Sequence, residues 1–131
     1  MRGAVSRWLP VLAWAAAIFW LSSQSTLPHL PRFVAWDKLQ HALGYSVGGF
    51  LLARAVGVRG RGTVIAAALG MLYGASDEVH QAFVPGRSTD VLDWTADAVG
   101  VLAGVFIYRF IHPRRARGGS AAASAAEASA T

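Results

Sequence analysis

A strongly polar stretch between two apolar runs most constrains what this chain can fold into. Residues 73–97, YGASDEVHQAFVPGRSTDVLDWTAD, hold five of the seven acidic residues. One apolar run precedes the stretch from Thr63 to Leu72, and another follows it from Ala98 to Ile111. Carboxylates at the ends of apolar helices are costly to hold near a bilayer, so by default they indicate a functional site. The sequence therefore predicts a helical hairpin that carries polar side chains at one membrane surface.

Composition places the chain among integral membrane proteins. Of its 131 residues, 54% are hydrophobic and 15% are charged, whereas about 25% are charged in an average soluble domain. The length allows one domain at most. Cysteine is absent, which excludes disulfides and thiolate metal sites. The net charge of +5 does not indicate a nucleic-acid partner, because the basic residues form no single face and no patch interleaved with aromatic residues.

Four apolar segments predict the fold class, an all-α, membrane-embedded bundle of four transmembrane helices. The first is preceded by a short basic segment, and we expect an uncleaved anchor rather than a secretory signal because no A-x-A-like site follows it. The predicted spans cover residues 8–22, 37–58 and 63–83, and a fourth span runs from a cap at Ser88 or Thr89 to Ile111.

Prolines and glycines mark the connections between these spans. Pro28 and Pro31 predict a loop over residues 24–36, since neither fits inside a helix. Pro85 and Gly86 predict the turn of the hairpin. Low complexity near the end of the chain predicts disorder. We expect a four-helix membrane domain over residues 1–112, then a disordered cytoplasmic tail over 113–131 that is first basic and then rich in Ala and Ser.

Basic residues predict the orientation. Nine lie beside the termini or the loop between spans two and three, and three lie on the side of the hairpin. Because cytoplasmic loops carry the excess of Lys and Arg, we expect both termini in the cytoplasm and the polar hairpin outside. The nine are Arg2, Arg7, Arg54, Arg59, Arg61, Arg109, Arg114, Arg115 and Arg117, and the three are Arg32, Lys38 and Arg87.

Helix geometry brings polar residues from three predicted helices to one depth. With a rise of about 1.5 Å per residue, His41, Asp77 and Asp97 lie roughly 18–21 Å from the cytoplasmic ends of their helices. In a hydrocarbon core of about 30 Å, this depth is the outer third of the bilayer. We therefore expect one outward-facing polar layer, whose members are Asp37, Lys38, His41, Tyr45, Asp77, Glu78, Gln81, Arg87, Asp93 and Asp97.

Each predicted helix also carries its polar residues on one face. Gly70 and Gly74 continue the face on span three, and Gly100 and Gly104 continue it on span four. Small residues let helices approach closely in membranes, so we expect the polar faces to meet one another rather than lipid. The faces are Asp37, His41 and Tyr45 on span two, Tyr73, Asp77 and Gln81 on span three, and Asp90, Asp93 and Asp97 on span four.

Three kinds of chemistry fit this layer. Carboxylates with a histidine can bind a divalent cation, but the chain has no dense metal motif such as H-E-x-x-H. We therefore assign no cofactor and keep a divalent metal as an alternative. A histidine beside a carboxylate can also serve general acid–base catalysis, with Arg87 and Lys38 holding an anionic group. A buried charge network that only fixes helix register is the third account. His80, one residue off the face, is expected to be interfacial rather than a ligand.

Several motifs resemble the VanZ-like family of small bacterial membrane proteins, which is named for a member associated with teicoplanin resistance. They are WLSSQS at 20–25, DKLQHALGYSVGG at 37–49, YGASDEVHQAFVPGR at 73–87 and DWTADAVGVLAG at 93–104. Asp97 occupies a position where the family pattern has Asn most often. The resemblance maps the patterns DK-x-x-H-x-x-x-Y, E-x-x-Q with the following Arg, and D-x-x-x-N onto Asp37, Lys38, His41, Tyr45, Glu78, Gln81, Arg87, Asp93 and Asp97.

The resemblance implies a multi-pass protein of the bacterial cytoplasmic (inner) membrane that acts in the cell envelope, with glycopeptide resistance as the associated phenotype. The expected partners are the lipid bilayer and a cell-wall precursor or lipid headgroup. The alternative is a membrane-embedded hydrolase or transferase acting on a lipid-linked phosphate or another envelope substrate. We assign no catalytic residue, and the candidates for an enzyme are His41, Glu78 and Asp97. The R-x-x-x-x-x-H-x-x-x-D motif of lipid phosphatases does not occur.

Overall fold

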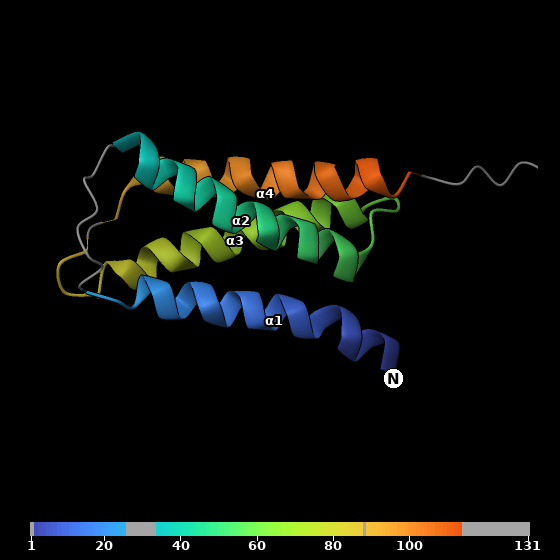
Figure 1. The fold of residues 1–131 in the computed structure, drawn as a ribbon, viewed down its shortest axis with the longest axis horizontal. Helices are drawn as coiled ribbons and strands as arrows, with labels where there is room; N and C mark the ends of the chain where they lie inside the picture. Colours follow the sequence, from blue (N-terminus) through green and yellow to red (C-terminus); the bar gives the residue numbers. More distant parts are fainter. Residues whose placement is uncertain (1, 26–33, 88, 114–131) are drawn as a thin grey trace, which may run out of the picture.

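The described residues form four α-helices and no strand. The computed structural model describes residues 2–25, 34–87 and 89–113. The helices run in alternating directions, so the start of α1, the α2–α3 connection and the end of α4 share one end of the bundle (Figure 1). The hairpin between α3 and α4 lies at the other end. The predicted all-α class is confirmed; the helices are α1 (Arg2–Ser22), α2 (Val34–Val56), α3 (Gly62–Gln81) and α4 (Val91–Ile111).

Several predicted helix ends were wrong by a few residues. α1 begins at Arg2 rather than at residue 8, and it continues through Pro10. α2 begins at Val34 rather than at residue 37, because the apolar residues after the last proline contain no further helix breaker. α2 ends at Val56 and α3 at Gln81, each two residues before its predicted end. Of the predicted loop over 24–36 and the predicted tail over 113–131, residues 26–33 and 114–131 lie outside the described residues.

The predicted turn is confirmed, but the predicted cap of the fourth helix was wrong. Gly86 has a φ of +82°, and the backbone N–H of Arg87 donates to Val84 O at 3.1 Å. This geometry needs a glycine at the third turn position and suits proline at the second, where Pro85 lies. The N-cap of α4 is Asp90, whose Oδ1 accepts from Leu92 N at 2.8 Å. Neither predicted residue fills that place, and Ser88 lies outside the described residues.

Two of the four helices are long and apolar enough to cross a membrane by length and composition alone. They are the segments Gly3–Ser22 and Val91–Ile111. Among the described helices, α2 and α3 do not meet the same criterion. α2 and α3 contribute most of the polar side chains to the layer described below. Of the four predicted spans, two therefore meet the criterion of length and composition.

The contact between α2 and α4 is the most extensive in the bundle, and glycines bring the two backbones together. A Cβ added at Gly100 would collide with the backbone of Ala42, and one added at Gly104 with the backbone of Ser46. From the other side, a Cβ at Gly49 would collide with the backbone of Val101. Such close approach is the packing mode expected of small residues in membrane helices.

α1 packs on α2 and α3 and makes no helix–helix contact with α4. Trp14 anchors it, because the indole lies over Gly48 and its Nε1 donates to Gly44 O at 3.0 Å. From α3, the Tyr73 hydroxyl donates to Ala15 O at 2.5 Å. α1 therefore covers one flank of a bundle whose closest contacts lie between the other helices.

The glycine contact between α2 and α4 predicts a sharp difference between two alanine substitutions. Gly104→Ala places a methyl group against the Ser46 backbone, which cannot move aside without separating the helices. We expect a loss of about 1–3 kcal/mol of unfolding free energy. The control is Gly44→Ala, whose Cβ meets only Ile18 Cδ1 at an ordinary 3.6 Å. It should be neutral, or stabilising by up to about 1 kcal/mol. Thermal unfolding in detergent measures both, and equal melting temperatures would contradict this packing.

Candidate functional site

Buried polar side chains gather at the hairpin end of the bundle. Four of them are carboxylates, at Asp77, Glu78, Asp93 and Asp97. Asp97 has no exposed surface, and Asp77 and Glu78 are 4% and 8% exposed. Most members of the predicted layer are therefore buried inside the bundle. The buried polar residues of the described chain are Ser22, Asp77, Glu78, Gln81, Asp93 and Asp97.

An ion-paired network joins α2 to α4. The Lys38 ammonium donates to Asp90 Oδ2 at 2.6 Å and to Asp93 Oδ1. One turn deeper, His41 Nδ1 lies 2.9 Å from Asp97 Oδ1. The other ring nitrogen of His41, Nε2, lies 3.9 Å from Asp93 Oδ1. Lys38 and His41 of α2 thus alternate with the carboxylates at the start of α4.

Asp90 is the exposed end of this network. Lys38 donates a hydrogen bond to its carboxyl and lowers its pKa below the ordinary range, and the bond from Leu92 N acts in the same direction. Because the pKa of Asp90 is lower in the folded state than in the unfolded chain, the contact with Lys38 stabilises the fold at pH values above the ordinary Asp pKa. This stabilisation is lost as the pH falls through the lowered pKa. The Lys38–Asp90 contact is therefore fully present at neutral pH.

Glu78 reaches the same network from α3 and leaves one oxygen unused. Its Oε2 accepts from the backbone N–H of Asp90 at 3.0 Å. Its Oε1 has no hydrogen-bond partner within the described chain, and the same holds for Asp97 Oδ2 and the Tyr45 hydroxyl. Buried oxygens without a partner are rare in native proteins and call for an explanation, such as a functional role or a bound ion. Three of them lie on the helices that form this layer.

A second polar cluster joins α1 to α3. Asp77 Oδ2 accepts from Ser22 Oγ at 2.8 Å and from Gln81 Nε2 at 3.0 Å. The partners of this carboxylate are therefore neutral donors. Ser22 was missing from the predicted layer, although it lies in the WLSSQS motif. It could have been found only if the end of α1 had been placed against α3, which local periodicity does not indicate.

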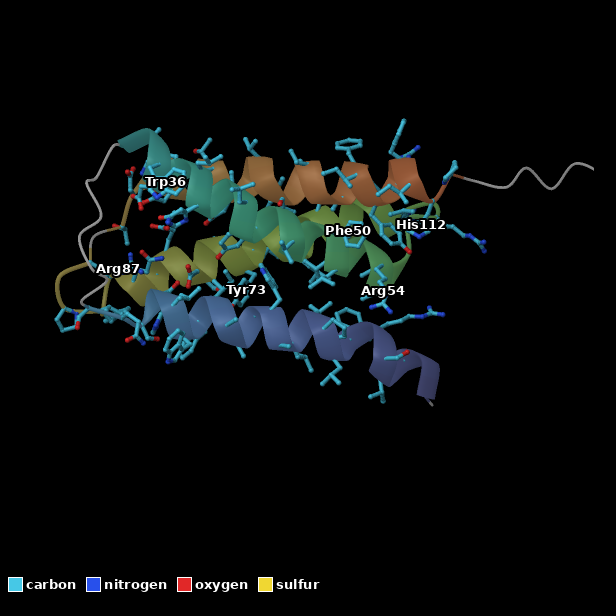
Figure 2. The ribbon with its side chains drawn as sticks, in the orientation of Figure 1. Trp36, Phe50, Arg54, Tyr73, Arg87 and His112 are labelled. Carbon is cyan, nitrogen blue, oxygen red and sulfur yellow. The ribbon has the colours of Figure 1, made fainter. Side chains whose placement is uncertain are left out.

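The two cations expected to hold an anionic group are differently placed. Lys38 is already engaged by two carboxylates, so its ammonium is not free for such a role. Arg87 lies at the hairpin end (Figure 2), and its Nη2 donates to Leu21 O at 3.3 Å. Its Nε is buried and has no partner among the described residues. Arg87 therefore keeps a buried N–H donor without a described partner, whereas the charge of Lys38 is offset by two carboxylates.

The remaining predicted residues surround these clusters. Asp37 is half-buried one turn before His41. Tyr45 is 2% exposed, and its ring contacts Trp14 edge-on, with centroids 5.5 Å apart. His80 does not join the layer, because it stacks on Phe19 at 4.4 Å and its Nε2 lies 3.0 Å from Ser23 Oγ.

Only one trio of side chains is placed to share a metal ion within the described residues. Ligand atoms of His41, Glu78 and Asp97 lie within 4.8 Å of one another. These are the three residues named above as candidates for acid–base chemistry. An imidazole held 2.9 Å from a buried carboxylate can also exchange a proton with a bound group.

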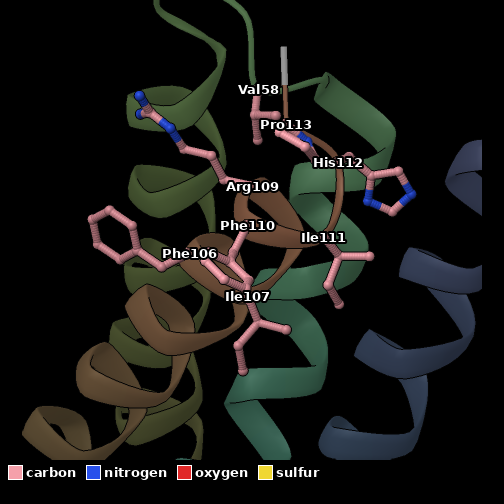
Figure 3. Close-up of a pocket in the computed structure, with 8 residues that line it drawn as sticks. All are labelled: Val58, Phe106, Ile107, Arg109, Phe110, Ile111, His112 and Pro113. Carbon is pink, nitrogen blue, oxygen red and sulfur yellow. The ribbon is translucent and has the colours of Figure 1, made fainter. Parts of the chain in front are cut away.

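A concave apolar surface lies at the opposite end of the bundle (Figure 3). It is formed around the last turn of α4, with Phe106, Ile107 and Phe110 among its lining residues. Among the described residues that line it, Arg109 and His112 are the ionisable ones. It holds none of the predicted site residues, so the candidate site remains the polar layer.

The position of Asp97 against α3 can be tested by cross-linking. A Cβ at Gly74 would lie 3.3 Å from Asp97 Cβ, close to the separation of about 3.8 Å in disulfides. In this chain without cysteine, Gly74→Cys with Asp97→Cys should cross-link on mild oxidation, as judged by electrophoretic mobility. Gly74→Cys with Asp93→Cys is the matched control, since residue 93 lies about 6 Å away along α4. Equal linking of both pairs, or linking of the control alone, would contradict the placement.

Comparison with known proteins agrees with the resemblance seen in the sequence. The family model described as VanZ/LLP1 matches residues 7–112, which include all four helices apart from the first turn or so of α1. No curated protein and no solved structure matches the chain. The family match and the two helices able to cross a membrane indicate a membrane protein. Since the matched region covers most of the chain, the protein belongs to the VanZ/LLP1 family.

Proposed function

We propose that all four helices span the bacterial cytoplasmic membrane, so that residues 1–112 form one multi-pass domain. The helices contain 21, 23, 20 and 21 residues, and about 20 residues suffice to cross a hydrocarbon core of about 30 Å. Each helix also exposes a large apolar side chain, for example Leu12, Leu43, Leu72 and Phe106. The charges of α2 and α3 lower their mean hydropathy, but the carboxylates of α3 face the bundle interior, where a membrane helix tolerates them.

The proposed orientation has both termini in the cytoplasm and the polar layer open to the outside. The positive-inside rule supports it, through the nine basic residues against three. The alternating helix directions supply the geometry, since the start of α1 and the end of α4 lie at the end opposite the hairpin (Figure 1). The lipid bilayer is then the first partner of this protein.

The function we propose is binding of a cell-envelope component, a lipid headgroup or a lipid-linked cell-wall precursor, in the polar layer. The observation that carries this proposal is the burial of four carboxylates at one end of the bundle. Apolar residues of similar size would be neutral or stabilising at most buried charged positions. Stability alone therefore does not account for them. By its family, the phenotype to examine is resistance to glycopeptides such as teicoplanin.

A second candidate function is a membrane-embedded hydrolase or transferase acting on a lipid-linked phosphate. The 2.9 Å contact between His41 Nδ1 and Asp97 Oδ1 favours it, because this pairing orients an imidazole for proton transfer. Glu78 adds a second carboxylate to the same place. Release of phosphate or of a headgroup by the purified protein would distinguish this function from binding alone.

The proposed orientation is tested by reporter fusions. Fusions at Arg59 and after Arg117 should report a cytoplasmic location, and a fusion beside Pro85 should report the outside, because the basic residues favour the cytoplasm. The paired reporters are alkaline phosphatase, active outside, and a fluorescent protein, active inside. A cytoplasmic signal from the fusion at Pro85 would overturn the orientation and with it the outward-facing site.

The proposed binding role predicts that stability and activity separate in variants of the layer. The double variant His41→Leu with Asp97→Leu, which removes both partners of the pair, and the single variant Glu78→Leu should melt no more than a few degrees below the parent, or above it, since the removed buried charges no longer have to be desolvated. They should nevertheless lose most of any glycopeptide protection that the parent confers on an expressing host.

The matched control is Ser76→Ala on the exposed face of α3, where the hydroxyl bonds only to Tyr73 O within its own helix. It should melt and protect like the parent. If both leucine variants protect fully, the layer is a structural network and the binding role is refuted.

A further inference from the structure

We propose that His41, Glu78 and Asp97 bind one divalent first-row cation, Zn²⁺ or Mn²⁺, inside the bundle. The site takes one residue from each of α2, α3 and α4, and the candidate ligand atoms lie within 4.8 Å of one another. This inference depends on the geometry of the three residues and not on the envelope ligand proposed above. It can therefore succeed or fail independently of that function.

Two unused oxygens are the independent sign of a ligand. Glu78 Oε1 and Asp97 Oδ2 are buried and have no hydrogen-bond partner in the described chain, and their residues are 8% and 0% exposed. The other oxygen of each carboxylate is already engaged, by Asp90 N and by His41. Each carboxylate thus has one oxygen without a hydrogen-bond partner, and in Glu78 the other oxygen fixes the orientation of the group.

The charge of the trio also favours a divalent cation. Two carboxylates with a neutral imidazole carry a charge of −2. Among the salt bridges of the described chain, no Lys or Arg reaches Glu78 or Asp97. The nearby Lys38 is engaged by Asp90 and Asp93. Since unpaired buried charges are strongly unfavourable, one divalent cation would neutralise the trio.

The donor types select the class of metal. An imidazole nitrogen with carboxylate oxygens suits Zn²⁺ and Mn²⁺, whereas Mg²⁺ and Ca²⁺ prefer oxygen donors alone. Ligand atoms that share such an ion lie at most about 4.2 Å apart, twice a metal–ligand distance of about 2.1 Å. The trio, whose atoms lie within 4.8 Å of one another, therefore needs to contract by well under 1 Å.

Asp93 lies beside the second ring nitrogen of His41, where such sites have an outer contact. With His41 Nδ1 bound to the ion in place of its contact with Asp97 Oδ1, the other ring nitrogen, Nε2, has Asp93 Oδ1 3.9 Å away, and Lys38 holds that carboxylate in place. Metal-bound histidines almost always donate their second N–H to a carboxylate, a carbonyl or water. Three protein ligands also leave a coordination position open, as in zinc sites that bind a substrate or a water molecule.

The test is metal uptake by the full chain purified in detergent. The protein is stripped with EDTA, equilibrated with Zn²⁺, Mn²⁺ or Mg²⁺ and dialysed, and its metal content and melting temperature are then measured. We expect one equivalent of Zn²⁺ or Mn²⁺ per chain with a higher melting temperature, and no retained Mg²⁺. Less than half an equivalent of both Zn²⁺ and Mn²⁺ in the parent would overturn the proposal, whatever the variants do.

Variants then locate the ion. Glu78→Gln and Asp97→Asn keep shape and remove one charge each, and each should weaken Zn²⁺ binding at least tenfold in a competition titration with a chelating dye. His80→Gln and His112→Gln are the controls, since both histidines lie outside the trio, and they should bind like the parent. If the controls lose the ion and the two trio variants keep it, the ion is bound elsewhere and the proposal is wrong.

Discussion

The close backbone contact between α2 and α4 is the constraint on which the polar layer depends. Gly100 lies against the backbone of Ala42, and Gly104 lies one turn further on against Ser46. This register also fixes which neighbouring residues meet. His41 directly precedes Ala42, and it contacts Asp97, which lies one turn before Gly100. Lys38 meets Asp93 one turn closer to the hairpin. The glycines therefore position the site without contributing a side chain to it.

Two polar clusters of different character share the hairpin end of the bundle. Between α2 and α4 the carboxylates meet a lysine and a histidine, whereas between α1 and α3 Asp77 meets only the neutral donors Ser22 and Gln81. Hydrogen bonds to a carboxylate contribute more than those between neutral groups, so Asp77 also helps to fix α1 to the bundle. The polar interior at this end and the large apolar side chains exposed on the helices together depart from the pattern of a soluble helical protein.

Much of this arrangement could be predicted because its determinants are local. The spacing of Asp93 and Asp97 places both on one face of a helix, and the structure buries both. The partners could not be predicted, since Ser22 and Asp77 lie 55 positions apart and periodicity carries no information about such pairs. The cap of α4 was wrong for a related reason: Ser88, Thr89 and Asp90 are all capping residue types. The choice of Asp90 coincides with long-range contacts to Lys38 and Glu78.

Asp97 shows how a single side chain sets the chemistry of a buried position. An Asn there would offer an amide N–H₂ donor in place of the second carboxylate oxygen. Two buried acceptors on the neighbouring helices, Glu78 Oε1 and Tyr45 Oη, lack a partner in the described chain. With Asp, the same place holds only acceptors and one more negative charge, which no described Lys or Arg offsets. A carboxylate at this position therefore needs a shared proton or a cation where an amide would need neither. The metal proposed above supplies that cation, and the Asp97→Asn variant, which places an amide there, removes the need for it.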